Sequence, residues 1–319
     1  MQIKDLKMMF NIMTRSLSTG NSCWSSTNKT LLAKLRKKTG YTFANCKKAL
    51  ELHNNNIEEA EKWLKAQAQA LGWSKATKLE GRPTLQGLVA LTVDGRNAAM
   101  VELNCETDFV ARNKNFVSLA ELAVRTCLDF TNKQSTIQQV TKMCLDNERL
   151  KTLPVNDGKT LADHLALLIG TVGENLALRR AVCFHVGTDV KLAGYAHPAP
   201  PLDTRILLGR YGAILAFKQN SPPSLEGLPK EHIGRQLCQH IVGMNPEKIG
   251  EVGEDTPAEN PDDEHCMIFQ EYLLDPSVIV NQVLGDSGIS LLDFTRFECG
   301  ETSTGVIPQE KEEAVEIGG

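Results

Sequence analysis

Apolar positions in the middle of the chain change from a strand-like to a helix-like pattern near residue 104. Residues 87–103 hold two apolar runs joined at Asp94-Gly95, a dipeptide that favours a type I′ hairpin turn. Farther along, apolar residues recur at steps of four and three, the period of a helix with one buried face; they are Phe116, Ala120, Ala123, Cys127 and Phe130. The stretch from Asn104 to Asn113 therefore lies where a hairpin strand is followed by a helix.

Helical periods also mark the segment before this hairpin. Between residues 29 and 70, three apolar stripes are spaced as helix faces; they are Leu31, Leu32 and Leu35, then Phe43, Cys46, Ala49 and Leu50, then Ile57, Ala60, Trp63 and Leu64. Gly40 and Asn54-Asn55-Asn56 separate the stripes, as expected where helices end. Three helices in so short a segment predict a small bundle.

The second half of the chain repeats an order of strand, turn, strand and helix. Strands are predicted over residues 176–186, 190–197, 212–218 and 294–300, and helices over residues 161–169 and from about residue 230. Residues 131–160 show no apolar period and contain the turn signal Asn156-Asp157-Gly158. The predicted fold class is α+β: a three-helix bundle followed by two related subdomains of antiparallel strands and helices.

Composition distinguishes the ends of the chain from its middle. Residues 1–28 are basic, Ser-rich and poor in acids, which is typical of a mitochondrial transit peptide, although an ordinary disordered N-terminus is the alternative. Gly72, Gly81 and Pro83 indicate a linker, and the polar C-terminal residues indicate a disordered tail. The predicted domains are the transit peptide (1–28), the bundle (29–70), the linker (71–84), the first subdomain (85–160), the second subdomain (161–300) and the tail (301–319).

Charge and cysteine usage exclude several classes of protein. A net charge of −4 and a pI near 6.0 argue against a general nucleic-acid binder, which is normally basic. No apolar run approaches the length of a membrane span, so neither nucleic acid nor membrane is an expected partner. The nine cysteines are scattered without a Cys-x-x-Cys pair, which favours a reducing compartment over a zinc or disulfide framework.

The predicted bundle is basic although the whole chain is acidic. Residues 29–75 hold ten Lys and Arg against four Glu. A solvated surface is the ordinary explanation for such a charge excess.

No arrangement for covalent chemistry is visible. The sequence contains no Gly-rich phosphate loop, no Gly-x-Ser-x-Gly and no His-Glu-x-x-His. Cys105 with a distant histidine could form a thiol nucleophile, but its place at the end of a buried strand favours an inert core cysteine. We therefore expect a binding protein that is not an enzyme and that uses no cofactor or metal ion.

The residues from Thr107 to Val110 allow two interpretations. Thr107 can cap the helical turn that follows, and Asp108 would then stabilise the positive end of that turn. Phe109 would either pack into the core as a staple or project outward from a rigid support. Spacing alone favours the core position for Phe109.

Several segments of the chain resemble one family. Asn-Cys-Glu-Thr-Asp-Phe-Val-Ala-Arg-Asn, residues 104–113, closely resembles the signature stretch of elongation factor Ts, the guanine-nucleotide exchange factor for elongation factor Tu. Residues 35–40 and 45–50 resemble the ubiquitin-associated-type (UBA-like) helical domain that opens members of this family. Gly173-Glu174-Asn175 followed by Arg179-Arg180, and the closing segment 294–300, resemble the family as well. The resemblance covers about residues 29–300.

This resemblance implies a working site as well as a function. A member of the family binds elongation factor Tu carrying GDP and promotes GDP release, so that GTP can replace it. Thr107, Asp108, Phe109 and Val110 match the stretch that presses on the GTPase and dislodges its Mg²⁺ ion. Phe109 would be a wedge between helices of the GTPase, and Asp108 would hold or redirect polar groups nearby.

Three further residues match docking positions of the family. Phe43 and Lys47 lie in the predicted bundle, and His197 lies at the end of a predicted strand. Bacterial members commonly have another apolar residue in place of Phe43, and Pro198 stands where glycine is usual. Together with the composition of residues 1–28, the resemblance implies residence in the mitochondrial matrix. An adaptor whose bundle binds ubiquitin-like partners is the alternative function.

Overall fold

The computed structural model describes residues 26–133, 139–199, 204–220 and 232–301. The predicted transit peptide and C-terminal tail lie almost entirely outside the described residues. The chain divides into two compact units, Met1–Lys65 and Ala66–Gly319. None of the described helices is long and apolar enough to cross a membrane.

The first unit contains the predicted helical bundle. Its helices are α1 (Ser26–Thr39), α2 (Phe43–Leu52) and the beginning of α3 (Ile57–Leu79). They enclose a small apolar core of Leu32, Leu35, Tyr41, Cys46, Ala49, Leu50, Ala60 and Leu64. Gly40 has a positive φ of 75° just after α1, a backbone conformation that commonly follows the last turn of a helix and favours glycine.

The predicted linker over residues 71–84 is wrong for most of its length, because α3 stays helical to Leu79. Gly72 suggested a break, since glycine is a poor helix former. In the structure Gly72 instead permits close packing against α7 (Leu161–Val172): a Cβ built there would lie 2.0 Å from the carbonyl oxygen of Ala166. Gly170 makes the matching approach from α7, where a Cβ would lie 2.2 Å from the carbonyl oxygen of Ala68.

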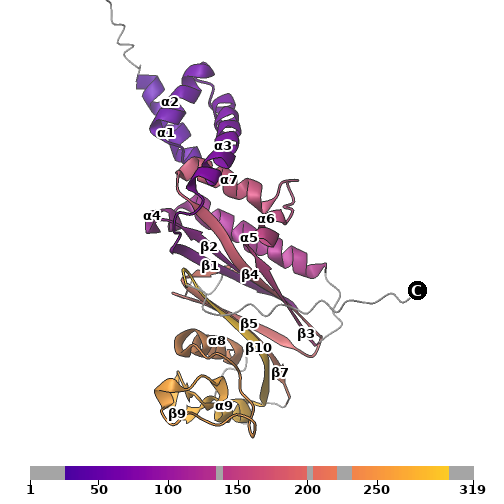
Figure 1. Ribbon diagram of the computed structural model, residues 1–319. Helices are drawn as coiled ribbons and strands as arrows, with labels where there is room; N and C mark the ends of the chain where they lie inside the picture. The colour runs from indigo at the N-terminus through magenta and orange to yellow at the C-terminus, as the bar shows by residue number, and fades with distance from the viewer. Residues whose placement is uncertain (1–25, 134–138, 200–203, 221–231, 302–319) are drawn as a thin grey trace, which may run out of the picture. The chain divides into compact units, whose positions relative to one another are not determined.

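The second unit is built on two antiparallel sheets (Figure 1). The five-stranded sheet has the order β3-β4-β2-β1-β6, with β1 Gln86–Asp94, β2 Asn97–Cys105, β3 Val140–Asp146, β4 Leu176–Val186 and β6 Leu207–Gly209. The three-stranded sheet has the order β10-β7-β5, with β5 Lys191–His197, β7 Tyr211–Gln219 and β10 Ile289–Glu298. The other elements are α4 (Asp108–Ala111), α5 (Lys114–Asn132), α6 (Asn147–Thr152), α8 (Ile233–Met244), α9 (Val280–Ser287), the β8–β9 pair (Glu271–Tyr272, Asp275–Ile279) and two short 3₁₀ turns (Pro261–Asp263, Met267–Phe269).

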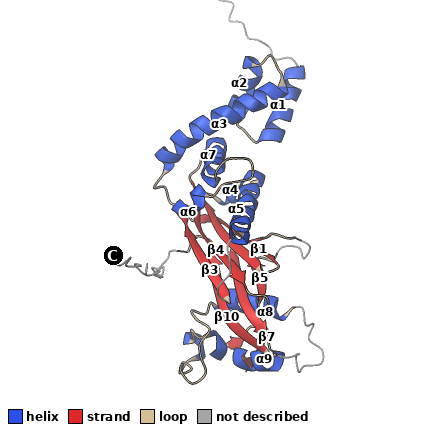
Figure 2. Ribbon diagram, turned by 90° about the vertical axis from the view of Figure 1, so that its right-hand side faces the viewer, coloured by secondary structure: helices blue, strands red, loops and turns tan. Residues whose placement is uncertain are grey.

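Apolar side chains pack the second unit into four layers. Leu88 and Ala90 of β1 point into a core shared with α5 and α7, whereas Val89 and Leu91 point into a core shared with the second sheet. This double burial explains the continuous apolar run of β1, since each face of the strand is covered. A third core joins α8 to the outer face of β7. Figure 2 shows α5 and α8 beside different sheets.

The β1–β2 hairpin is confirmed, but its turn differs from the predicted type. Asp94 pairs with Asn97, so the two loop residues are Gly95 and Arg96. Of these two residues, Gly95 alone has a positive φ, 58°. A positive φ at the first loop position only is the pattern of a type II′ turn rather than type I′.

The α+β class is confirmed, but the predicted division at residue 160 passes through the first sheet. β4 pairs with both β2 and β3, and α7 packs on the same core as α5. Residues 131–160, which lacked an apolar period, include β3 and α6. β3 lies at the edge of the sheet and most of its residues are only half-buried, so no alternation of apolar and polar side chains marked it.

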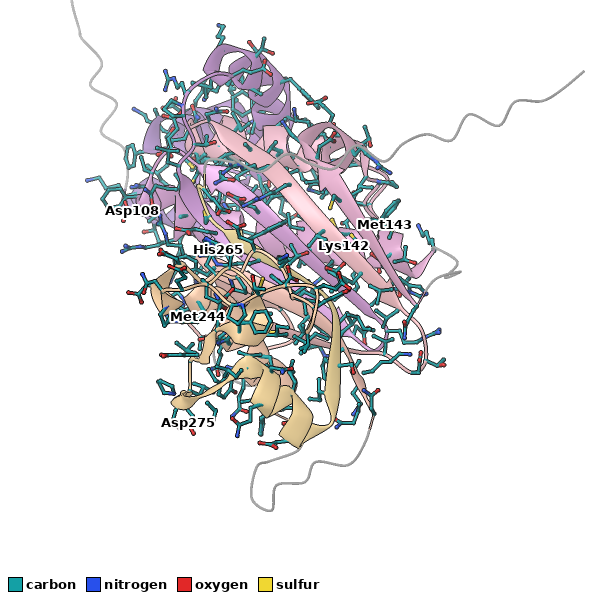
Figure 3. All side chains as sticks on the ribbon, turned by 60° about the horizontal axis from the view of Figure 1, so that its bottom comes forward. Asp108, Lys142, Met143, Met244, His265 and Asp275 are labelled. Atoms are coloured by element: carbon teal, nitrogen blue, oxygen red, sulfur yellow. The ribbon has the colours of Figure 1, made fainter. Side chains whose placement is uncertain are left out.

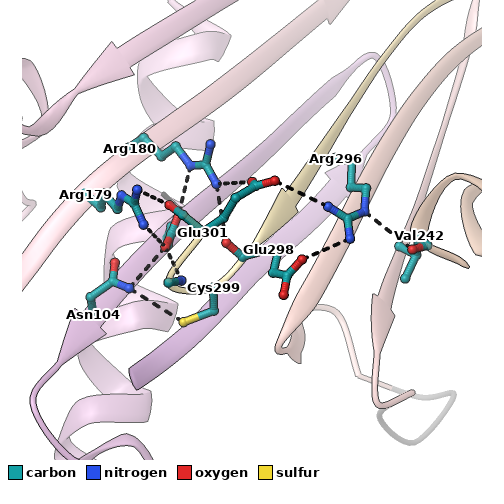
Figure 4. A network of polar contacts seen from close by, with 10 residues as sticks. Asn104, Arg179, Arg180, Val242, Arg296, Glu298, Cys299 and Glu301 are labelled. Carbon is teal, nitrogen blue, oxygen red and sulfur yellow. Dashed lines mark hydrogen bonds and ion pairs between the residues drawn. The ribbon is translucent and has the colours of Figure 1, made fainter. Parts of the chain in front are cut away.

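A buried carboxylate fastens the end of β10 to the first sheet, within a polar network that includes Arg179 and Arg180 (Figure 4). Glu102 on β2 is fully buried and pairs with Arg179 at 3.1 Å and Arg180 at 2.7 Å, both on β4. The backbone N–H of Gly300 donates to the same carboxylate at 2.8 Å. A buried charge destabilises a fold unless it is paired and hydrogen-bonded. These three partners therefore fix the C-terminal strand end against β2.

Candidate functional site

The short helix α4 begins with the cap that the sequence predicts. Thr107 has an extended backbone, and its hydroxyl oxygen accepts a hydrogen bond from the N–H of Val110 at 3.4 Å. The helix is only four residues long, and Asn113 then caps α5 by accepting from the N–H of Asn115 at 2.8 Å. The two caps produce a sharp corner between β2 and α5.

Two neighbouring residues of α4 have opposite environments. Phe109 is 82% exposed, the largest value among the exposed large apolar residues of the described chain, whereas Val110 is 8% exposed. Val110 belongs to the core between the first sheet and its helices. The core interpretation of Phe109 is therefore wrong: Val110 is the apolar anchor of this turn, and Phe109 projects away from it.

Asp108 lies in the first turn of α4 with its side chain half-exposed. Its carboxylate pairs with the guanidinium of Arg112 at 3.0 Å. An exposed ion pair of this kind contributes little to stability. Asp108 and Arg112 can therefore exchange it for contacts with another molecule at a small cost in free energy. Figure 3 shows Asp108 at the outer edge of the molecule.

The base of α4 is held by polar contacts with the turn between α7 and β4. Glu174 accepts hydrogen bonds from the N–H of Thr107 at 3.1 Å and from its hydroxyl at 2.8 Å. In return, Glu106 accepts from the N–H of Asn175 at 2.7 Å. Sequence reasoning missed these partners: the Gly173-Glu174-Asn175 motif was noticed, but its pairing with residues 106 and 107 has no local signal.

Cys105 lies directly beneath this corner and is fully buried. Burial raises the pKa of its thiol to about 12, and the carboxylate of Glu174 acts in the same direction. The thiol donates to the carbonyl oxygen of Thr107 at 3.1 Å. Its burial confirms that Cys105 is a core cysteine, and a protonated, buried thiol is a poor nucleophile.

His197 lies on the second sheet, at the end of β5. Its Nδ1 atom is 3.1 Å from the hydroxyl of Tyr195, and its ring lies 6.3 Å from that of Tyr211. These three rings line an open groove together with Leu273 and Arg296. His197 is exposed and is thus accessible to a partner.

Phe43 and Lys47 lie one turn apart on α2, in the first unit. Phe43 is 56% exposed and lines a basic groove with Lys29, Arg36 and Lys37 of α1. Lys47 forms a loose pair with Glu51 at 3.8 Å. Of the seven predicted site residues, only the four consecutive residues of the α4 corner form one continuous site; the other three lie on α2 and β5.

No group of three or more His, Cys, Asp or Glu residues is placed to hold a metal ion in the part of the chain that the structure describes. The exposed corner presents an aromatic side chain, a carboxylate and a guanidinium on a fixed support.

Comparison with known proteins gives a consistent result along the chain. Residues 14–74 match the family model described as "Elongation factor Ts, mitochondrial, N-terminal", and residues 106–259 match "Elongation factor TS". A protein of Aedes aegypti named "Elongation factor Ts, mitochondrial" is 51% identical over 300 residues, which cover 92% of this chain and 96% of the relative. Proteins of the same name from Drosophila melanogaster and Homo sapiens are 49% identical over 292 residues and 40% identical over 282 residues. The alignments cover 90% of this chain and 90% of the fly protein, and 87% of this chain and 85% of the human protein.

Proposed function

The chain belongs to the elongation factor Ts family, a family of protein-synthesis factors, and we propose that it binds elongation factor Tu carrying GDP and releases that GDP in mitochondria. One observation carries the proposal: Phe109 stands 82% exposed on a corner that Thr107 and Val110 anchor. Single exposed apolar residues are common on protein surfaces, but an aromatic side chain on so firm a support has the character of an interface contact, where aromatic residues are enriched.

The proposed mechanism is a displacement without covalent chemistry. Mg²⁺ requires near-ideal octahedral geometry, so a small shift of its surroundings weakens its hold on the nucleotide phosphates. Phe109 enters between helices of the GTPase, and Asp108 exchanges Arg112 for polar groups of the partner. Thr107 and Val110 hold the α4 turn in place while it presses on the GTPase.

Coupling between the two ligands of elongation factor Tu must be reciprocal. If this protein weakens GDP binding, GDP weakens the binding of this protein by the same factor. GTP, present in excess, then binds the emptied GTPase and displaces the factor. The protein is therefore an exchange factor and not an enzyme that makes or breaks a bond.

The remaining predicted residues are assigned to docking. Phe43 and Lys47 give the UBA-like bundle of residues 29–70 an apolar and basic contact surface. His197 gives the second sheet a separate contact. Separate patches of this kind add interface area around a central anchor.

We also propose that the protein works in the mitochondrial matrix after loss of its first 16 to 28 residues. The basic, acid-poor composition of that segment and the relatives named as mitochondrial support this. Sequencing the N-terminus of the protein isolated from mitochondria tests it. An intact Met1, or residence of the protein in the cytosol, would contradict it.

The function itself is tested by following fluorescent GDP on mitochondrial elongation factor Tu. Addition of this protein should speed GDP release, and unlabelled GTP should complete the exchange. Capture of ubiquitin but not of elongation factor Tu from defined mixtures would favour the adaptor alternative instead. An unchanged release rate at saturating concentration would overturn the proposed function.

A further inference from the structure

The turn between α7 and β4 and the corner before α4 hold each other by a closed set of hydrogen bonds. Glu174 accepts two bonds from Thr107, and the N–H of Asn175 donates to Glu106. The side chain of Asn175 also donates to the carbonyl oxygen of Arg82 at 2.9 Å, and Arg82 pairs with Glu106 at 3.5 Å. Three segments far apart in the sequence therefore meet at the base of α4.

Glu174 controls both the backbone and the side chain of the capping residue. Its two carboxylate oxygens accept from the N–H and the hydroxyl of Thr107, at 3.1 Å and 2.8 Å. A hydroxyl has one hydrogen and two lone pairs. Because that hydrogen is directed to Glu174, a lone pair of the Thr107 oxygen is free to accept from the N–H of Val110. The carboxylate of Glu174 thus sets the orientation in which Thr107 caps α4.

The display of Phe109 depends on this cap. A helix of four residues has no stability of its own. Phe109 is too exposed to be fixed by its own packing, so its direction is set by the residues on either side of it. Val110 fixes one end of the turn in the core, and Thr107 fixes the other end through Glu174.

We propose that Glu174 is a positioning residue for nucleotide exchange: by holding Thr107, it sets the direction in which α4 presents Phe109. This inference rests on the proposed function and extends it to a residue outside the α4 corner. Charge-assisted hydrogen bonds of this length are stronger than neutral ones, which suits a support that must resist force. Gly173, with a φ of 80°, reverses the chain after α7 and brings Glu174 to Thr107.

The neighbouring contacts make a clean test possible. Glu174 is only half-buried, so its truncation leaves no sealed cavity. The bonds from Asn175 to Glu106 and Arg82 would still join the two segments in a Glu174→Ala variant. That variant should release Thr107 without detaching the whole turn.

The experiment is a double-mutant cycle in the fluorescent GDP-release assay, with each protein at saturating concentration. Glu174→Ala should slow catalysed GDP release about tenfold, the effect of losing charge-assisted hydrogen bonds. In a Phe109→Ala background, Glu174→Ala should cause almost no further loss, because the side chain that it positions is gone. Glu174→Gln retains one acceptor for the Thr107 N–H and should recover part of the rate. Glu148→Ala, which removes an exposed carboxylate of α6, is the matched control and should behave as the wild type.

The outcomes separate this inference from the function on which it rests. Full activity of Glu174→Ala beside an inactive Phe109→Ala would overturn the positioning role alone. Equal losses from Glu174→Ala in both backgrounds would indicate a general structural role and would also overturn it. A wild-type protein that leaves GDP release unchanged would overturn the proposed function, and the inference with it.

Discussion

Each of the two units of this protein has an exposed phenylalanine at the start of a short helix. Phe43 and Phe109 each lie in the first turn of a helix that a threonine caps, Thr42 for α2 and Thr107 for α4. Both side chains are mostly exposed, 56% for Phe43 and 82% for Phe109. Their supports differ: among the described residues, the Thr42 hydroxyl is hydrogen-bonded only to the N–H of Asn45, whereas Thr107 is also held twice by Glu174.

The difference in support suggests different roles, with Phe43 adding interface area and Phe109 displacing part of the partner. A side chain that only adds interface area can be held loosely, because the partner orders it on binding. A side chain that displaces part of the partner must keep its position while the partner resists, and this requires a fixed backbone around it. We therefore expect Phe109 to control the rate of exchange and Phe43 to control affinity.

Replacing Phe109 tests the wedge directly. Phe109→Ala should reduce catalysed GDP release about thirtyfold or more, the usual cost of losing a central aromatic anchor. The free energy of unfolding should change by less than about 0.5 kcal/mol, because the side chain is exposed in the free protein. A thermal melt and a GDP-release assay on the same purified variant measure both quantities. A collapsed melt would show that Phe109 supports the fold.

Replacing Val110 should lower the stability of the fold more than the rate of GDP release, the reverse of what is expected for Phe109→Ala. Val110→Ala removes two buried methyl groups and should cost about 2 kcal/mol of stability through lost burial and a residual cavity. Denaturant unfolding measures this loss. GDP release at a temperature where the variant remains folded should fall less than it does for Phe109→Ala. A Val110→Ala variant as stable as the wild type would contradict the anchor role.

The sequence predicts the elements around the α4 corner better than it predicts their connections. The strand over residues 176–186 and the Thr107 cap were both predictable, because each depends on a local pattern of residues. The hydrogen bonds that Thr107 donates to Glu174 span 67 residues, so no local sequence pattern indicates them. Residue spacing alone favoured the wrong direction for Phe109, since four helical residues are too few to show a period, whereas the family resemblance implied the exposed position.

The predicted boundaries of the linker and of the second subdomain are wrong because both depend on contacts between segments far apart in the sequence. Gly72 suggested a linker, but it is a contact point between α3 and α7. β4 was placed in the second subdomain because it follows α7 in sequence, yet it pairs with β2 in the first sheet. Strand pairing of this kind depends on long-range contacts, which periodicity cannot report.

Replacing Phe43 tests the other side of the comparison. Phe43→Ala should weaken binding to elongation factor Tu about threefold, as expected for a contact outside the central anchor. The rate of GDP release at saturating factor should stay unchanged, because Phe109 is intact. Titration of the release rate against factor concentration separates these two quantities. A lower rate at saturation would mean that the bundle also takes part in displacement.

Charge reversal at Lys47 tests how the bundle docks, through an effect that should be confined to low salt. Lys47→Glu should slow association with elongation factor Tu about threefold at low salt, because an exposed charge acts mainly on the encounter rate. The effect should shrink as salt rises, since charges are screened beyond about 10 Å at 0.1 M ionic strength. Lys151→Glu is a matched control: Lys151 also pairs with a glutamate of its own helix, at 3.0 Å, but lies on α6. Stopped-flow association at several salt concentrations distinguishes the two variants. If the Lys47→Glu defect persists unchanged at high salt, Lys47 acts through a specific short-range contact, and electrostatic docking of α2 is wrong.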